Sequence, residues 1–114
     1  LDLFSNYYDT VQWKLSPLNI LNNINRIGDI KDHKEVLSLK HTELLNVQEE
    51  MVRKIIHELK EFDNLYYEVC NEPYFGDTLA LREWEERMTG VVFVAEKDFP
   101  LKQDFILADK PFLI

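Results

Sequence analysis

The most regular pattern of apolar and polar positions in the chain is helical. Between Thr42 and Glu61 apolar residues recur at intervals of three and four, while charged residues occupy most of the opposite side. The stripe consists of Leu44, Leu45, Met51, Val52, Ile55, Ile56 and Leu59, with Gln48 among them. A second helical period runs from Ala80 to Phe99. It contains the β-branched run 91–94, which favours a strand locally, but the longer period predicts a helix throughout.

Three shorter segments have the composition of strands. Leu1–Ser5 has the pattern of a strand end, Leu65–Asn71 is rich in aromatic and β-branched residues up to Pro73, and Gln103–Ala108 follows the second helix. Since strands and helices alternate, we expect a parallel sheet with Leu65–Asn71 in its middle. Alternation places one set of side chains on one face and a more polar set on the other. The first set is Leu65, Tyr67 and Val69, and the second is Tyr66, Glu68, Cys70 and Glu72.

The segment from Asn6 to about Lys40 is much longer than the ~2–6 residues of an ordinary strand-to-helix connection. Ser16-Pro17 has the residue types of a helix start, so we predict one or two turns over the residues that follow, up to Asn23. Trp13 lies in this segment with Tyr7 and Tyr8 among polar residues. Its ring could stack on a sugar or fix the loop to the scaffold, and both interpretations stay open. For the two tyrosines the structural role is favoured.

Composition limits the classes of partner. The 114 residues carry a formal net charge of −8, which argues against nucleic acid and anionic membrane surfaces as partners. No apolar stretch approaches the length of a membrane span, so we expect no membrane association.

The lone Cys70 predicts packing rather than a disulfide, and His33, His41 and His57 lack the spacing of metal ligands. We therefore expect neither a metal nor another cofactor. Because the chain begins inside an apolar run, we expect it to be a piece of a larger protein.

The stretch from Phe62 to Tyr74, which contains Asn71-Glu72-Pro73 after an apolar strand, resembles the fourth strand of the clan A (β/α)8 glycoside hydrolases, such as cellulases and mannanases. The resemblance implies an α/β fold, a partial (β/α)8 TIM barrel in which residues 1–114 supply strands three to five of one catalytic domain. It implies that Glu72 is the general acid/base and that Asn71 contacts the sugar 2-hydroxyl. The nucleophile would lie on the seventh strand, in the missing part of the barrel. The implied substrate is an oligosaccharide or polysaccharide with β-linkages, cleaved with retention.

Several alternatives accompany this hypothesis. Trp13 and Tyr74 are candidate sugar platforms, whereas Glu72 could instead be an ion-paired glutamate at a strand end. Strict alternation directs Asn71 away from the face of Glu72, so both can serve one site only if the pleat breaks near Pro73. Glu68 lies deeper and is expected to be a buried partner of an arginine or a hydroxyl. The alternative function is that of a non-catalytic carbohydrate-binding or structural relic of the same fold.

Overall fold

Two short strands and two long helices form the centre of the molecule. The computed structural model describes residues 1–5, 9–71 and 77–97. The elements are β1 (Asp2–Phe4), α1 (Thr10–Leu15), the 3-10 turns η1 (Ile20–Asn22) and η2 (His33–Glu35), α2 (Thr42–Leu59), β2 (Glu68–Cys70) and α3 (Thr78–Lys97). The described part is thus an α/β fold. Both long helices predicted from the sequence are confirmed, and residues 91–94 are helical.

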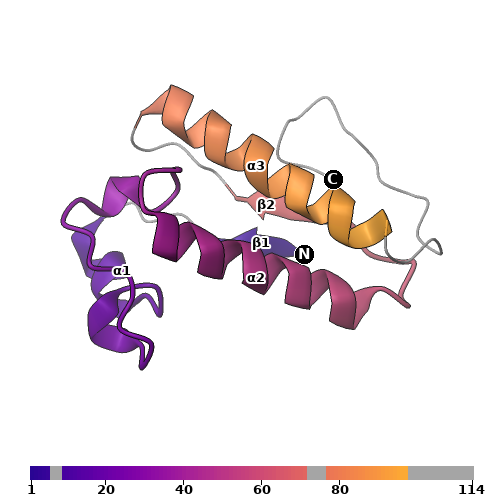
Figure 1. Ribbon diagram of the computed structural model, residues 1–114, viewed down its shortest axis with the longest axis horizontal. Helices are drawn as coiled ribbons and strands as arrows, with labels where there is room; N and C mark the ends of the chain where they lie inside the picture. Colours follow the sequence, from indigo (N-terminus) through magenta and orange to yellow (C-terminus); the bar gives the residue numbers. More distant parts are fainter. Residues whose placement is uncertain (6–8, 72–76, 98–114) are drawn as a thin grey trace.

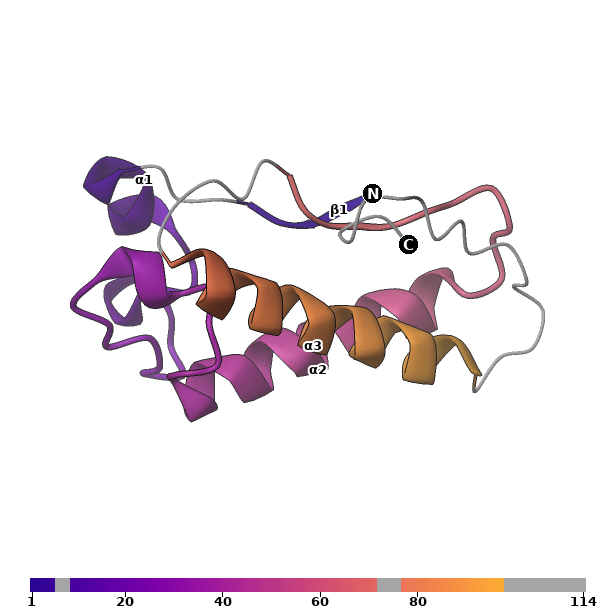
Figure 2. The same cartoon turned by 90° about the horizontal axis from the view of Figure 1, so that it is seen from above.

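The two strands pair in parallel, as predicted. Asp2 lies opposite Glu68 and Phe4 lies opposite Cys70, and α2 makes the connection between the strands. Figure 1 shows the strands between and behind the two long helices, and Figure 2 shows them as one layer with α2 and α3 as the other. The predicted strand Gln103–Ala108 lies outside the described residues, so the central position of the second strand stays a prediction.

The core fills the space between the strands and the two helices. Its fully buried side chains come from all three: Tyr67 and Val69 beside and in β2, Val52 and Ile56 in α2, and Trp84, Met88 and Val92 in α3. The rings of Phe4 and Trp84 meet edge to face with centroids 4.9 Å apart, a favourable aromatic geometry. Tyr66, by contrast, is 58% exposed. The aromatic contact joins the end of β1 to the first half of α3.

The long segment after β1 contains a helix that the sequence pattern did not predict. Asp9 begins α1 by accepting the backbone N–H of Gln12 at 2.8 Å. The predicted start at Ser16-Pro17 is confirmed in part: the Ser16 N–H donates to Trp13 O at the end of α1, while its hydroxyl accepts from Leu18 N and its carbonyl from Asn19 N, both at 3.1 Å, so one turn begins there and no longer helix follows. The next turn, η1, begins only after Asn19, whose side chain accepts from Leu21 N.

Asparagine side chains hold this segment together. The Asn23 amide donates to three backbone carbonyls at 2.9–3.2 Å, and the Asn22 amide donates to two. Gly28 has a φ of +86°, and a Cβ there would lie 1.8 Å from the carbonyl oxygen of Leu18. Only glycine fits this position, since both the backbone angle and the close approach exclude a side chain. We call residues 9–28 the asparagine-braced segment.

None of the described helices is both long and apolar enough to cross a bilayer.

Candidate functional site

The candidate site lies where the parallel strands end. The carboxyl ends of β1 and β2 are adjacent, and α3 begins at Thr78, shortly after β2. Asn71 is the first residue beyond β2, and its side chain is exposed. Two predicted site residues, Glu72 and Tyr74, lie outside the described residues.

The chain leaves the regular strand at Asn71. The backbone N–H of Glu68 donates to Leu1 O at 2.8 Å, toward β1. In a regular strand successive N–H groups point to opposite edges, so the N–H of Asn71 would point away from β1. It donates instead to Oδ1 of Asp2 on β1, at 3.1 Å. The chain thus bends at Asn71, and the break in the pleat that would bring Asn71 and Glu72 to one site stays a prediction, because Glu72 lies outside the described residues.

The Cys70 thiol lies close to this strand end. Cys70 is fully buried, and its thiol is 3.7 Å from the carbonyl oxygen of Asn71. Burial raises the pKa of Cys70 to about 12, and the nearby carboxylates of Asp2 and Glu85 add to the effect. A thiol with this pKa stays protonated, which agrees with a packing role and not with that of a nucleophile.

Glu85 on α3 is a buried acid in the same region. It is 3% exposed, and its Oε1 has no hydrogen-bond partner among the described residues. Burial raises the pKa of Glu85 to about 7, while the charge of Arg82 acts in the opposite direction. At neutral pH a large share of this side chain is therefore uncharged.

Asp2 itself is partly desolvated. Burial raises its pKa, whereas the hydrogen bond from Asn71 N and the charge of the Leu1 amino group oppose that rise. The bond to Asn71 N favours the ionised carboxylate, which is the stronger acceptor. Glu68, opposite Asp2 in the register, is half-buried.

Trp13 lies in the interior of the fold. It is 8% exposed and belongs to the main hydrophobic core. A ring that stacks on a sugar needs an accessible face, so this burial favours the structural interpretation of Trp13. Tyr7 and Tyr8 lie outside the described residues.

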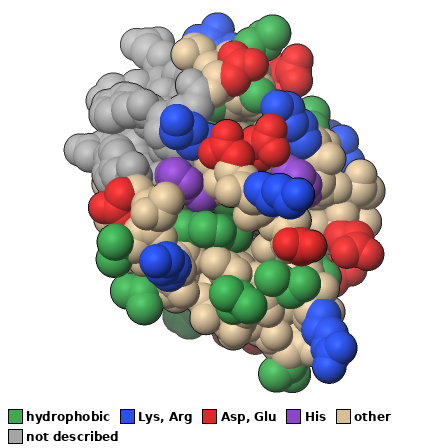
Figure 3. Space-filling model, turned by 90° about the vertical axis from the view of Figure 1, so that its left-hand side faces the viewer, with side chains coloured by type: hydrophobic (Ala, Val, Ile, Leu, Met, Phe, Trp, Pro, Cys, Tyr) green, Lys and Arg blue, Asp and Glu red, His purple; other side chains and the backbone are tan. Residues whose placement is uncertain are grey.

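The end of the molecule around α1 and η1 carries apolar side chains at its surface. Val11, Leu15, Leu21 and Ile24 are all exposed there. Figure 3 views this end, where apolar side chains gather on one part of the face and charged ones on another.

A polar pocket lies between the η2 loop and the first turns of α3. It has a volume of about 360 Å³ and is lined by Asp32, Lys34, Glu35, Leu37, Ser38, Lys40, Asp77, Ala80 and Leu81. Glu35 accepts from Lys40 at 2.9 Å and lies 3.2 Å from the His41 ring, contacts that lower the pKa of Glu35. One wall belongs to the connection from β1 to α2, and the other to the start of α3 after β2. Parallel α/β folds bind ligands at such strand-to-helix connections.

Buried hydrogen bonds fix the wall of this pocket. The Gln48 amide donates to Val36 O at 3.0 Å, and its Oε1 accepts from the Trp84 indole at 2.9 Å. We call these three residues the Gln48 bridge. It connects the η2 loop, α2 and α3.

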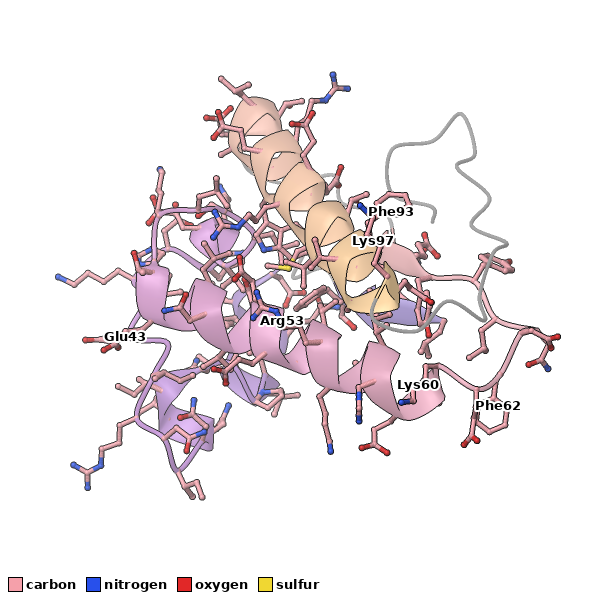
Figure 4. All side chains as sticks on the ribbon, turned by 45° about the vertical axis from the view of Figure 1, so that its right-hand side comes forward. Glu43, Arg53, Lys60, Phe62, Phe93 and Lys97 are labelled. Carbon is pink, nitrogen blue, oxygen red and sulfur yellow. The ribbon has the colours of Figure 1, made fainter. Side chains whose placement is uncertain are left out.

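A second connection between α2 and α3 lies nearer the surface. Buried Glu49 on α2 accepts from Arg87 on α3 at 2.6 Å and from Arg53 at 3.4 Å. Figure 4 shows Arg53 on α2. Glu49 is one of the charged residues outside the apolar stripe of this helix, yet its side chain is buried where α3 packs against α2.

Among the described residues no group of three or more His, Cys, Asp and Glu side chains could hold a metal ion. Sequence reasoning missed two groups near the strand end, Asp2 and Glu85. The position of Glu85 next to Trp84 and four residues after Leu81 is a signal that could have marked it as buried. Asp2 has no such signal, because it meets Asn71 across 69 residues of sequence.

Comparisons with protein-family models, curated proteins and solved structures found no match to this chain.

Proposed function

We propose that this chain forms part of a (β/α)8 barrel of a retaining glycoside hydrolase that cleaves β-linked oligosaccharides or polysaccharides. The observation that carries the proposal is the position of the Asn71-Glu72-Pro73 motif. The motif begins at the residue where the chain leaves the carboxyl end of β2, in a parallel β-α-β-α arrangement. This end of the strands is where (β/α)8 enzymes carry their catalytic groups.

In this proposal Glu72 protonates the leaving glycosidic oxygen and later deprotonates the attacking water. Asn71 bonds the 2-hydroxyl of the sugar, and its exposed side chain at the bend after the strand supports that role. The nucleophile comes from a later strand of the barrel. A retaining mechanism requires its carboxylate about 5–5.5 Å from that of the acid/base.

The proposal is tested by Glu72→Gln in the complete protein. We expect turnover of an unactivated β-glycoside to fall by about 10²–10⁴-fold, because an amide cannot donate the required proton. Sugar affinity should stay near that of the wild type, and an aryl glycoside with a good leaving group should lose less. Glu61→Gln, at an exposed glutamate beyond the end of α2, is the matched control and should retain full activity.

Wild-type rates of Glu72→Gln on the unactivated substrate would refute the assignment of the acid/base. A wild-type protein that binds oligosaccharides but does not turn them over would favour the alternative function, a non-catalytic carbohydrate-binding relic.

A further inference from the structure

We infer that the polar pocket between the η2 loop and the start of α3 holds one sugar unit of the saccharide substrate. Its volume of about 360 Å³ is in the range of small-ligand sites. The inference rests on the proposed function and adds to it a binding site outside the Asn71-Glu72-Pro73 motif, with lining residues between 32 and 40 and between 77 and 81.

Two aspartates on different walls of the pocket supply fixed hydrogen-bond acceptors. At the start of η2, Asp32 Oδ1 accepts the backbone N–H of Lys34 at 3.0 Å. Ahead of α3, Asp77 Oδ1 accepts the backbone N–H of Leu79, also at 3.0 Å. The second oxygen of each carboxylate accepts no hydrogen bond within the part of the chain that the structure describes. Acceptors that are already held in place lose little freedom when a ligand binds.

Lys40 supplies a donor between the two walls. Its ammonium group bonds Glu35 at 2.9 Å, and this bond, followed by the charges of Asp77 and Asp32, raises the pKa of Lys40. Both aspartates act on the same ammonium group, so the acceptors and the donor lie around one space. The buried hydroxyl of Ser38 fixes the backbone here, because it donates to Glu35 O at 2.6 Å and accepts from Lys40 N at 3.3 Å.

The charges and the apolar surface of the pocket favour a neutral ligand rich in hydroxyl groups. Three carboxylates outnumber the two ammonium groups of Lys34 and Lys40, which disfavours an anion. A hydroxyl group both donates and accepts, so neighbouring hydroxyls of a sugar can bond a carboxylate and an ammonium group together. The side chains of Leu37, Ala80 and Leu81 offer apolar surface to the C–H groups of the same ring.

The experiment follows the backbone amide NMR signals of residues 32–40 and 77–81 in the complete protein. Glucose and mannose are the first titrants, since neither can be hydrolysed and the result does not depend on turnover. We expect saturable shifts in both segments with a dissociation constant that is roughly millimolar, ordinary for a single small ring. A β-linked oligosaccharide of the same sugar, added to Glu72→Gln to prevent cleavage, should bind at least as tightly. Inorganic phosphate should shift neither segment.

Asp32→Asn and Asp77→Asn test the two acceptors. Asparagine keeps the oxygen that accepts the backbone N–H and replaces the second oxygen by an amide donor. We expect each variant to weaken binding of the monosaccharide about fivefold or more, because a charge-assisted hydrogen bond is lost. Asp9→Asn is the matched control: it makes the same change at the start of α1, outside the pocket, and should bind like the wild type.

Ala80→Phe tests the volume of the pocket and leaves both aspartates unchanged. A ring at position 80 occupies the space of the ligand, so we expect sugar binding to fall about tenfold or more. Leu79→Phe is its control, because the Leu79 side chain is 64% exposed and is not among the lining residues. This variant should bind like the wild type.

The inference is overturned if neither sugar moves the signals of the two segments, if Ala80→Phe or both aspartate variants bind like the wild type, or if phosphate saturates the pocket. Binding of the monosaccharide without the oligosaccharide would also overturn it, since the pocket would then not hold a unit of a saccharide chain. Its failure is separable from that of the proposed function. Loss of turnover in Glu72→Gln without sugar binding at these segments removes the pocket alone, whereas unchanged rates in Glu72→Gln remove the proposed acid/base.

Discussion

Replacing Gln48 by leucine would test the Gln48 bridge. Gln48, Trp84 and Val36 are 1%, 0% and 1% exposed, so neither the indole N–H nor the Val36 carbonyl can turn to water when the amide is removed. A buried polar group that loses its partner costs about 1–3 kcal/mol, and the substitution leaves two of them. The gain from a buried leucine side chain offsets part of this cost. We expect Gln48→Leu to lower the free energy of unfolding by about 3 kcal/mol.

Urea unfolding of the complete protein measures this change as a lower midpoint at an unchanged m-value. Asn46→Leu, which changes an exposed amide on the same helix, is the matched control and should stay within about 0.5 kcal/mol of the wild type. A double-mutant cycle with Trp84→Phe should give a coupling energy of about 1 kcal/mol, since each change removes one side of the same hydrogen bond. Amide exchange should also accelerate in residues 36–40. A loss below about 0.5 kcal/mol for Gln48→Leu would show that apolar packing alone holds the pocket wall.

Three further predictions concern buried groups and the isolated chain. Burial raises the pKa of Glu85 from 4.5 to about 7, so the folded state binds this proton more tightly than the unfolded state and loses stability as the pH rises from about 5 through 7. Glu85→Gln should therefore be more stable than the wild type by about 1–3 kcal/mol at pH 8 and closer to it at pH 5. Equal differences in stability at the two pH values would contradict this prediction. Since the pKa of Cys70 is raised to about 12, a thiol reagent should label it at pH 8 only as fast as the chain opens, a rate that rises with urea. The chain expressed alone should lack glycosidase activity and should self-associate or pack loosely, because the strands of a partial barrel leave free edges. Sedimentation and a thermal melt test this, and a monodisperse monomer with cooperative unfolding would contradict the barrel.

The two long helices could be predicted from the sequence because the helical spacing of their apolar residues repeats over many turns. The stripes of α2 and α3 extend over many turns, so that even residues 91–94 are helical despite their β-branched side chains. The short helix α1 escaped prediction, since its six residues show no period and its cap, Asp9, is an ordinary loop residue. After α1 two caps follow each other: Ser16 accepts from Leu18 N, as its predicted role implies, and Asn19 accepts from Leu21 N at the start of η1.

In the candidate site, too, local features could be predicted from the sequence and long-range contacts could not. The motif at Asn71 is local in sequence and was found, and its need for a broken pleat followed from alternation alone. The contact between Asp2 and Asn71 joins residues far apart in the chain and cannot be obtained from a local pattern. Likewise, the buried state of Glu49 depends on where α3 crosses α2.

The asparagine-braced segment has a consequence for how this protein can diversify. Five of its backbone carbonyls, those of Lys14, Ser16, Pro17, Asn19 and Ile27, accept from the side-chain amides of Asn22 and Asn23 within the same segment. A unit that closes on itself can exchange its outward side chains, such as Leu21 and Ile24, without disturbing the strands beneath it. Selection can therefore reshape this end of the molecule one surface residue at a time, while a change at Asn23 or Gly28 would dismantle the unit as a whole.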